Sequence, residues 1–188
     1  AGKHGKFGFF TSEAESYQKV AEELGILRKS KPGEPLEYAR HPLVYMVEAA
    51  DDICYEIMDI EDSHKLKILS FEETANLLLG FFDEETQQKI RQRILDEGLT
   101  DENEQVVYMR ACVIGKLENE CVNVFLNHEE EILAGIFEGC LIEHIAEHQR
   151  QAYQKCTQVS RKKIYASKPV LDIELSGYKI MADRKSVV

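Results

Sequence analysis

The 188-residue chain has no tryptophan, only four prolines, and no apolar run near the length of a membrane span. A helix needs about 20 consecutive apolar residues to cross a bilayer, so the sequence predicts no transmembrane segment. The chain also does not open with the basic and apolar segments of a signal peptide. Because helix breakers are few and apolar and polar residues do not alternate regularly, we expect an all-α, multi-helix bundle.

Closely spaced cysteine pairs are also absent. The five cysteines are an odd number and lie apart, inside apolar segments with helical character. This pattern is not typical of a disulfide framework. It favours reduced thiols in the core of a cytoplasmic protein. These residues are Cys54, Cys112, Cys121, Cys140 and Cys156.

Basic residues are outnumbered. The chain has 34 Asp and Glu against 23 Lys and Arg, which gives a net charge of -11. A charge of this sign argues against a protein that coats nucleic acid or anionic lipid over its whole surface, although local basic patches remain compatible with it. We expect no membrane partner.

The longest helical signal runs from His41 to Asp62 and contains no glycine and no proline after Pro42, which suits the first turn of a helix. At about 100° per residue, one face of this helix is apolar, and further apolar residues extend that face so far that we expect the helix to be largely buried. The face comprises Leu43, Val47, Ala50, Cys54, Ile57 and Met58, extended by Met46, Ile53 and Ile60.

An acidic stripe remains on the same helix, because Glu48, Asp51, Tyr55, Asp59 and Asp62 recur at spacings of three and four. Burying several like charges without compensation costs several kcal/mol each. A buried stripe of this kind therefore predicts a metal or polar-ligand site. The alternative is that the stripe is the solvated face of an amphipathic helix.

The segment from 40 to 55, RHPLVYMVEAADDICY, continues to DIED at 59–62. This run closely resembles the deoxyguanosine triphosphate triphosphohydrolase (dGTPase) family of HD-domain phosphohydrolases. The resemblance implies that Asp51 is the last ligand of a divalent metal site. It also implies that Tyr55 packs on the deoxyribose of a substrate and that Asp59 holds the 3′-hydroxyl.

Three further segments carry the same resemblance over almost the whole chain. KFGFF at 6–10, followed by Ser12 and Glu13, is similar to a family segment whose lysine contacts the substrate triphosphate, and that position is Lys6. From the residues alone, this segment is more typical of a hydrophobic staple before a helix. The segment YMRA, which contains Arg110, resembles a family helix. We expect the Arg110 side chain either to face the triphosphate or to snorkel at the surface. ELSGYKI at 174–180 matches a C-terminal signature.

The family's metal site also needs an upstream His and a His-Asp dyad, but none of the six histidines here is followed by Asp. We therefore expect residues 1–188 to be the C-terminal helical part of a dGTPase-like HD-domain protein whose dyad lies outside this sequence. The complete protein is expected to hydrolyse deoxynucleoside triphosphates, dGTP above all, to deoxynucleoside and tripolyphosphate. Its cofactor would be a divalent metal such as Mg²⁺ or Mn²⁺, and this chain alone would be inactive. The resemblance also implies a homo-oligomer, a hexamer in that family, and allows single-stranded DNA as a partner.

Two alternatives remain. The chain could be a non-catalytic helical assembly or nucleotide-sensing module that has kept the pocket and lost the metal. It could also be a zinc metallopeptidase, because His144-Ile-Ala-Glu147-His148 has the His-x-x-Glu-His arrangement of inverted zincins. Two His residues at i and i+4 on a helix can share one Zn²⁺, with the adjacent Glu as base.

The remaining sequence predicts four further helices from capping residues and glycine stops. The first opens with Ser12 and Glu15 and ends at Leu24 before Gly25, the second opens with Ser70 and Glu73 and ends near Gly80, the third spans 83–97 before Gly98, and the fourth spans 101–126.

Overall fold

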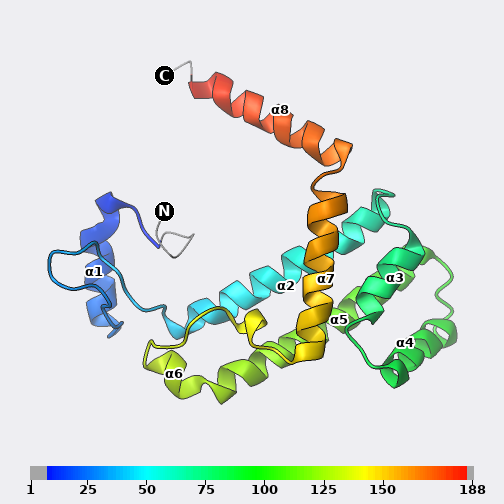
Figure 1. Cartoon of the computed structure of the whole chain (residues 1–188), viewed down its shortest axis with the longest axis horizontal. Coiled ribbons are helices and arrows are strands. Elements are labelled where there is room, and N and C mark those ends of the chain that lie inside the picture. Colours follow the sequence, from blue (N-terminus) through cyan, green and yellow to red (C-terminus); the bar gives the residue numbers. More distant parts are fainter. Residues whose placement is uncertain (1–7, 186–188) are drawn as a thin grey trace.

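The computed structural model describes residues 8–185, which form eight α-helices and no β-strand, as the sequence predicts (Figure 1). None of the helices in this described part is long and apolar enough to cross a membrane. The elements are η1 (Thr11–Glu13), α1 (Ala14–Glu23), α2 (Pro42–Lys65), α3 (Phe71–Leu79), α4 (Glu84–Asp96), α5 (Glu102–Asn127), α6 (Glu129–Leu133), η2 (Leu141–Glu143), α7 (Glu147–Val159), η3 (Ser160–Ile164) and α8 (Lys168–Lys185).

The two long helices α2 and α5 pack along each other and form the centre of the molecule. Helices α3 and α4 lie against one end of this pair, and α7 crosses α2 near its middle (Figure 1). In the same view α1 lies beyond the N-terminal end of α2, whereas α8 projects away from the bundle. The core between the helices is aliphatic and includes the fully buried residues Ile57, Ile60, Leu78, Val113 and Leu117.

Local signals in the sequence account for most helix boundaries. Ser70 and Glu73 form the predicted capping box, in which the Ser70 hydroxyl accepts from the Glu73 amide at 3.2 Å and the Glu73 carboxylate accepts from the Ser70 amide at 3.1 Å. Asp83 caps α4 by accepting from the Thr86 amide at 2.8 Å. Gly98 adopts a φ of 68° directly after α4, in the left-handed region that glycine tolerates best. These boundaries confirm the predicted helices at 70–80 and 83–97.

The predicted capping box of Ser12 and Glu15 is wrong, although the predicted end of that helix at Leu24 is confirmed. The chain enters α1 through the short turn η1, where the Glu13 carboxylate accepts from the amide of Phe10 at 2.9 Å. This contact starts the turn two residues earlier than the Ser12 motif requires.

The predicted orientation of α2 is also wrong. The helix buries Tyr45, Ala49 and Ile53 together with Ile57 and Ile60. Most of the predicted apolar face is exposed instead: Leu43, Val47, Ala50, Cys54 and Met58 face solvent. Helix α2 is apolar around most of its circumference, so periodicity alone could not distinguish the side that packs on α5.

All five cysteines have free thiols, but only Cys121 and Cys156 are buried, so the expectation of core positions holds for two of them. Burial raises the pKa of each of these two thiols to about 12. Cys54 is exposed on α2.

Leu117→Ala tests the packing of α2 on α5. Leu117 has no exposed surface, so removing its isobutyl group leaves a cavity and should lower the free energy of unfolding by about 2–5 kcal/mol. Leu126→Ala on the same helix is the matched control, because Leu126 is 60 % exposed and should change stability by about 0.5 kcal/mol or less. Urea unfolding followed by circular dichroism measures both, and equal effects would contradict this assignment of the core.

Candidate functional site

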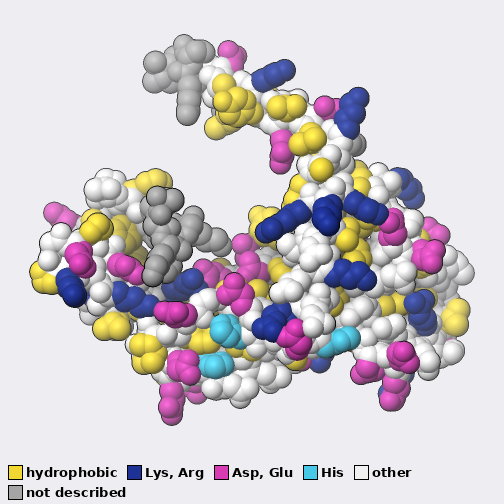
Figure 2. Space-filling view, viewed as in Figure 1, with side chains coloured by type: hydrophobic (Ala, Val, Ile, Leu, Met, Phe, Trp, Pro, Cys, Tyr) yellow, Lys and Arg dark blue, Asp and Glu magenta, His cyan; other side chains and the backbone are white. Residues whose placement is uncertain are grey.

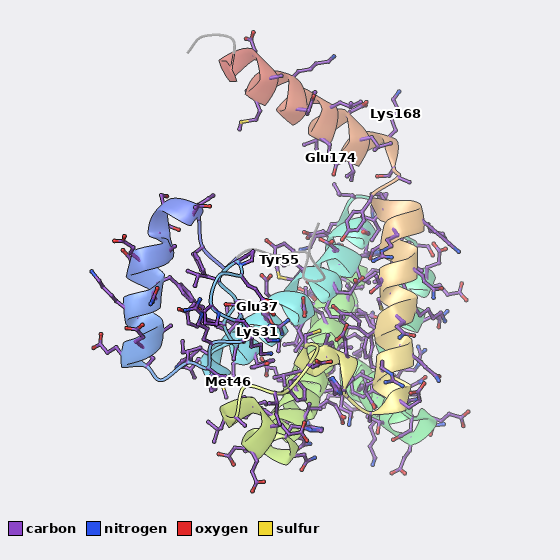
Figure 3. The ribbon with its side chains drawn as sticks, turned by 60° about the vertical axis from the view of Figure 1, so that its left-hand side comes forward. Lys31, Glu37, Met46, Tyr55, Lys168 and Glu174 are labelled. Atoms are coloured by element: carbon purple, nitrogen blue, oxygen red, sulfur yellow. The ribbon has the colours of Figure 1, made fainter. Side chains whose placement is uncertain are left out.

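The acidic stripe lies on the solvent-facing side of α2. Asp51, Tyr55 and Asp62 are exposed, with Tyr55 at 68 %, whereas Glu48 and Asp59 are half-buried. Figure 3 shows Tyr55 on α2 between the N-terminal helix and the column formed by α7. Two hollows on the described surface are lined by other residues. The structure thus brings Asp51, Tyr55 and Asp59 to one side of one helix and leaves Asp51 and Tyr55 open to water, so their roles remain predictions.

Glu48 at the start of the stripe is engaged in a structural contact. Its carboxylate pairs with Arg40 at 3.0 Å, and the same Arg40 nitrogen donates to the carbonyl of Gly139 at 2.7 Å. The guanidinium carbon of Arg40 also lies 5.3 Å from the ring centre of Tyr45, within cation–π range. Glu48 therefore helps to fix the loop before η2 on α2, which makes it a weaker candidate for ligand binding than Asp51.

Asp59 has a partner that the sequence did not reveal. The hydroxyl of Tyr165 donates to Oδ2 of Asp59 at 2.5 Å. This hydrogen bond is the main cause that raises the pKa of Tyr165 to about 12. The two residues are 106 positions apart, so no local spacing could have found the pair.

Arg110 lies between α2 and α5, where its side chain forms an ion pair that the sequence did not reveal. Its guanidinium donates to Oε2 of Glu61 at 2.6 Å, and Lys65 pairs with Oε1 of the same carboxylate at 2.5 Å. The Glu61 side chain is 4 % exposed and that of Arg110 is 26 % exposed, so the pair is partly buried between α2 and α5. A contact of Arg110 with a triphosphate remains a prediction. Lys6, the other candidate, lies outside the described residues.

The zinc-peptidase alternative does not have the geometry it needs. His144 lies in the turn after η2, and α7 begins only at Glu147, so His144 and His148 do not lie one turn apart on one helix. A ring nitrogen of His144 is 3.0 Å from the carbonyl of Glu138, and Glu147 pairs with Arg150. Residues 8–185 contain no group of three His, Cys, Asp or Glu side chains arranged to hold a metal ion. The His-x-x-Glu-His motif is thus interrupted by a helix start.

Comparison with known proteins gives a consistent similarity along the chain, although no family model matches it. The chain is 32 % identical over 177 residues to a deoxyguanosinetriphosphate triphosphohydrolase-like protein of Pseudomonas aeruginosa, which covers 94 % of the chain and 38 % of that protein. A protein of the same description from Synechocystis is 31 % identical over 178 residues, which covers 95 % of the chain and 38 % of the relative. A deoxyguanosinetriphosphate triphosphohydrolase of Yersinia enterocolitica is 25 % identical over 187 residues. This match covers 94 % of the chain and 35 % of the relative.

The fold and these similarities define an all-α relative of nucleotide triphosphohydrolases. More specifically, the chain belongs to the family of deoxyguanosinetriphosphate triphosphohydrolases and the proteins described as like them. It spans little more than a third of the length of the curated relatives that it matches.

Glu61→Gln should destabilise the fold by about 1–3 kcal/mol, because the neutral amide leaves the charge of Arg110 without its partner in a partly buried position. In a double-mutant cycle, Glu61→Gln combined with Arg110→Gln should cost less than the sum of the single changes, because the second substitution removes the charge that the first left unpaired. Glu85→Gln is the control, because Glu85 and Lys89 form an exposed pair and should contribute about 0.5 kcal/mol or less. Additive effects in urea unfolding would argue against the coupling.

Proposed function

We propose that this chain is the C-terminal part of a metal-dependent enzyme that hydrolyses deoxynucleoside triphosphates, dGTP above all, to deoxynucleoside and tripolyphosphate. The observation that carries the proposal is that Asp51, Tyr55 and Asp59, which the family resemblance assigns to the metal and the sugar, share one solvent-facing side of α2. Similarity to proteins named for this activity, over 94 % of the chain, supports it.

Asp51 suits the role of metal ligand because its carboxylate is exposed and no described side chain pairs with it. It supplies one oxygen, and the other ligands would come from an upstream His and a His-Asp dyad outside this sequence. Asp51 would help to hold a divalent metal, which when bound would supply Lewis-acid activation of water for attack on the α-phosphorus. Asp51 would hold that metal beside Tyr55, which follows it by one helical turn.

Tyr55 and Asp59, which follow Asp51 along α2, would bind the sugar. The Tyr55 ring is exposed and can pack on the face of a deoxyribose, and Asp59 can accept a hydrogen bond from the 3′-hydroxyl. Close packing at this position would leave no room for a 2′-hydroxyl and would favour deoxyribonucleotides. Lys6 would neutralise the triphosphate charge. Arg110 already pairs with Glu61, so we assign it a secondary role.

The family resemblance also suggests how the protein assembles and where it acts. We propose a homo-oligomer, a hexamer by analogy with the family, and single-stranded DNA as a partner class. The five free thiols fit a reducing compartment, so we place the reaction in the cytoplasm.

Substitutions in the complete enzyme separate the metal from the sugar. Asp51→Ala should lower kcat by about 100-fold or more, because losing an oxygen ligand weakens the metal that activates water. Asp59→Asn should mainly raise KM, by about 10-fold, because a charge-assisted hydrogen bond to the sugar is lost while the metal stays bound. Asp62→Asn, an exposed change on the same helix, should leave both parameters within about twofold.

Tripolyphosphate release from dGTP and metal content by atomic absorption measure these outcomes. The 188-residue chain by itself should release no tripolyphosphate, since it supplies one metal ligand only. Turnover by the isolated chain would show that the metal site is misplaced. Binding of dGTP by the complete protein, without turnover at any divalent metal concentration, would favour the nucleotide-sensing alternative.

A further inference from the structure

Hydroxyl groups from α7 and the segment after it form a line along α2. Tyr153 donates to the backbone carbonyl of Asp52 at 3.0 Å. One turn further along, Thr157 and Ser160 donate to the two carboxylate oxygens of Glu56 at 2.8 and 2.7 Å. Tyr165 completes the line at Asp59. Each of these hydroxyls thus fixes a specific acceptor on the helix that carries the candidate site.

A π-helical turn places Tyr165 in this line. Tyr153 and Thr157 of α7 and Ser160, the first residue of η3, recur at helical spacing, and in an uninterrupted α-helix the next position on that face would be Ile164. The structure instead has the π-turn η3, in which the amide of Tyr165 donates to the carbonyl of Ser160, five residues earlier, at 2.9 Å. The extra residue turns Ile164 into the core and brings Tyr165 toward α2. Such π-turns within helices occur frequently at functional sites.

The two carboxylates on this line are satisfied to different degrees. Glu56 is buried, and a hydroxyl donates to each of its oxygens. Asp59 is half-buried, and among the described residues a hydrogen bond reaches only its Oδ2, from Tyr165. Its Oδ1 therefore remains able to accept a hydrogen bond from a ligand. Glu56 therefore has a structural role, whereas Asp59 is oriented through Oδ2 and keeps Oδ1 available to a ligand.

Tyr165 acts as a donor throughout the physiological pH range. The hydrogen bond to Asp59 and burial raise the pKa of its phenol to about 12, the charge of Glu56 adds to this, and nearby Arg161 opposes it. Lys163 of η3 is occupied elsewhere, by Glu73 of α3. Figure 2 shows a group of Lys and Arg side chains over α7 and η3. The basic residues of η3 are Arg161, Lys162 and Lys163.

We infer that Tyr165 is a positioning residue for the sugar site: its phenol holds one carboxylate oxygen of Asp59 so that the other faces the 3′-hydroxyl of a deoxynucleotide. This inference rests on the function proposed above. It adds a residue from outside α2, held by a π-turn, and it predicts that the contribution of Tyr165 exists only when Asp59 and a 3′-hydroxyl are both present.

Steady-state kinetics of the complete enzyme with dGTP and with 2′,3′-dideoxyguanosine triphosphate tests this dependence. Tyr165→Phe should raise KM for dGTP about 5- to 10-fold and leave kcat within about twofold, because one oriented hydrogen bond to the ground state is weakened. For the dideoxy substrate the same change should have less than about a twofold effect. Tyr178→Phe, an exposed tyrosine on α8, is the matched control and should change neither substrate's KM.

A double-mutant cycle provides the second test. If Tyr165 acts through Asp59, Tyr165→Phe should have no further effect on KM in the Asp59→Asn background. Equal effects of Tyr165→Phe on both substrates, or additive effects with Asp59→Asn, would assign the tyrosine a structural role only and overturn the inference. If the unmodified enzyme itself fails to distinguish dGTP from the dideoxy substrate, the proposed role of Asp59 is wrong and the inference falls with it.

Discussion

The arrangement of this chain depends on how the buried acidic side chains of α2 find partners. Glu61 meets Arg110 of α5, and Glu56 meets two hydroxyls of α7 and η3. An ionised carboxylate away from water is costly unless hydrogen bonds compensate for it. These contacts therefore determine which side of α2 turns inward, because rotating the helix would leave both carboxylates without partners. The orientation of the candidate site follows as a consequence, since Asp51 and Tyr55 lie on the opposite side.

Much of the fold could be predicted from the sequence because its signals are local. The N-caps Ser70 and Asp83 and the stop at Gly98 each act within one or two turns of helix. The residues after Pro42 continue without a helix breaker to the end of α2. The orientation of α2 could not be predicted in the same way. Leu43 and Val47 are as apolar as Ile53 and Ile57, and only the positions of α5 and α7 distinguish the two sides.

The candidate site likewise has a part that the sequence predicts and a part that it does not. Asp51, Tyr55 and Asp59 share one helix, so helical spacing and the family resemblance could place them together from the sequence. Their positions on one side of α2 agree with that spacing, whereas their roles still await experiment. Tyr165 could not be found in this way, because it reaches Asp59 only after the chain has passed through α7 and a π-turn. A π-turn has no reliable sequence signature, and it changes which residue faces a neighbouring helix by one position.

The exposed position of Cys54 gives the molecule a built-in attachment point for a reporter group. The thiolate is the form of cysteine that reacts. Burial raises the pKa of the other four thiols: that of Cys112 is raised, that of Cys140 is raised to about 11, and those of Cys121 and Cys156 are raised to about 12. Cys54 is the exposed thiol of the five and lies three residues from Asp51 and next to Tyr55. A fluorophore coupled by maleimide chemistry would therefore concentrate on α2, where its emission would respond to whatever approaches this side of the helix.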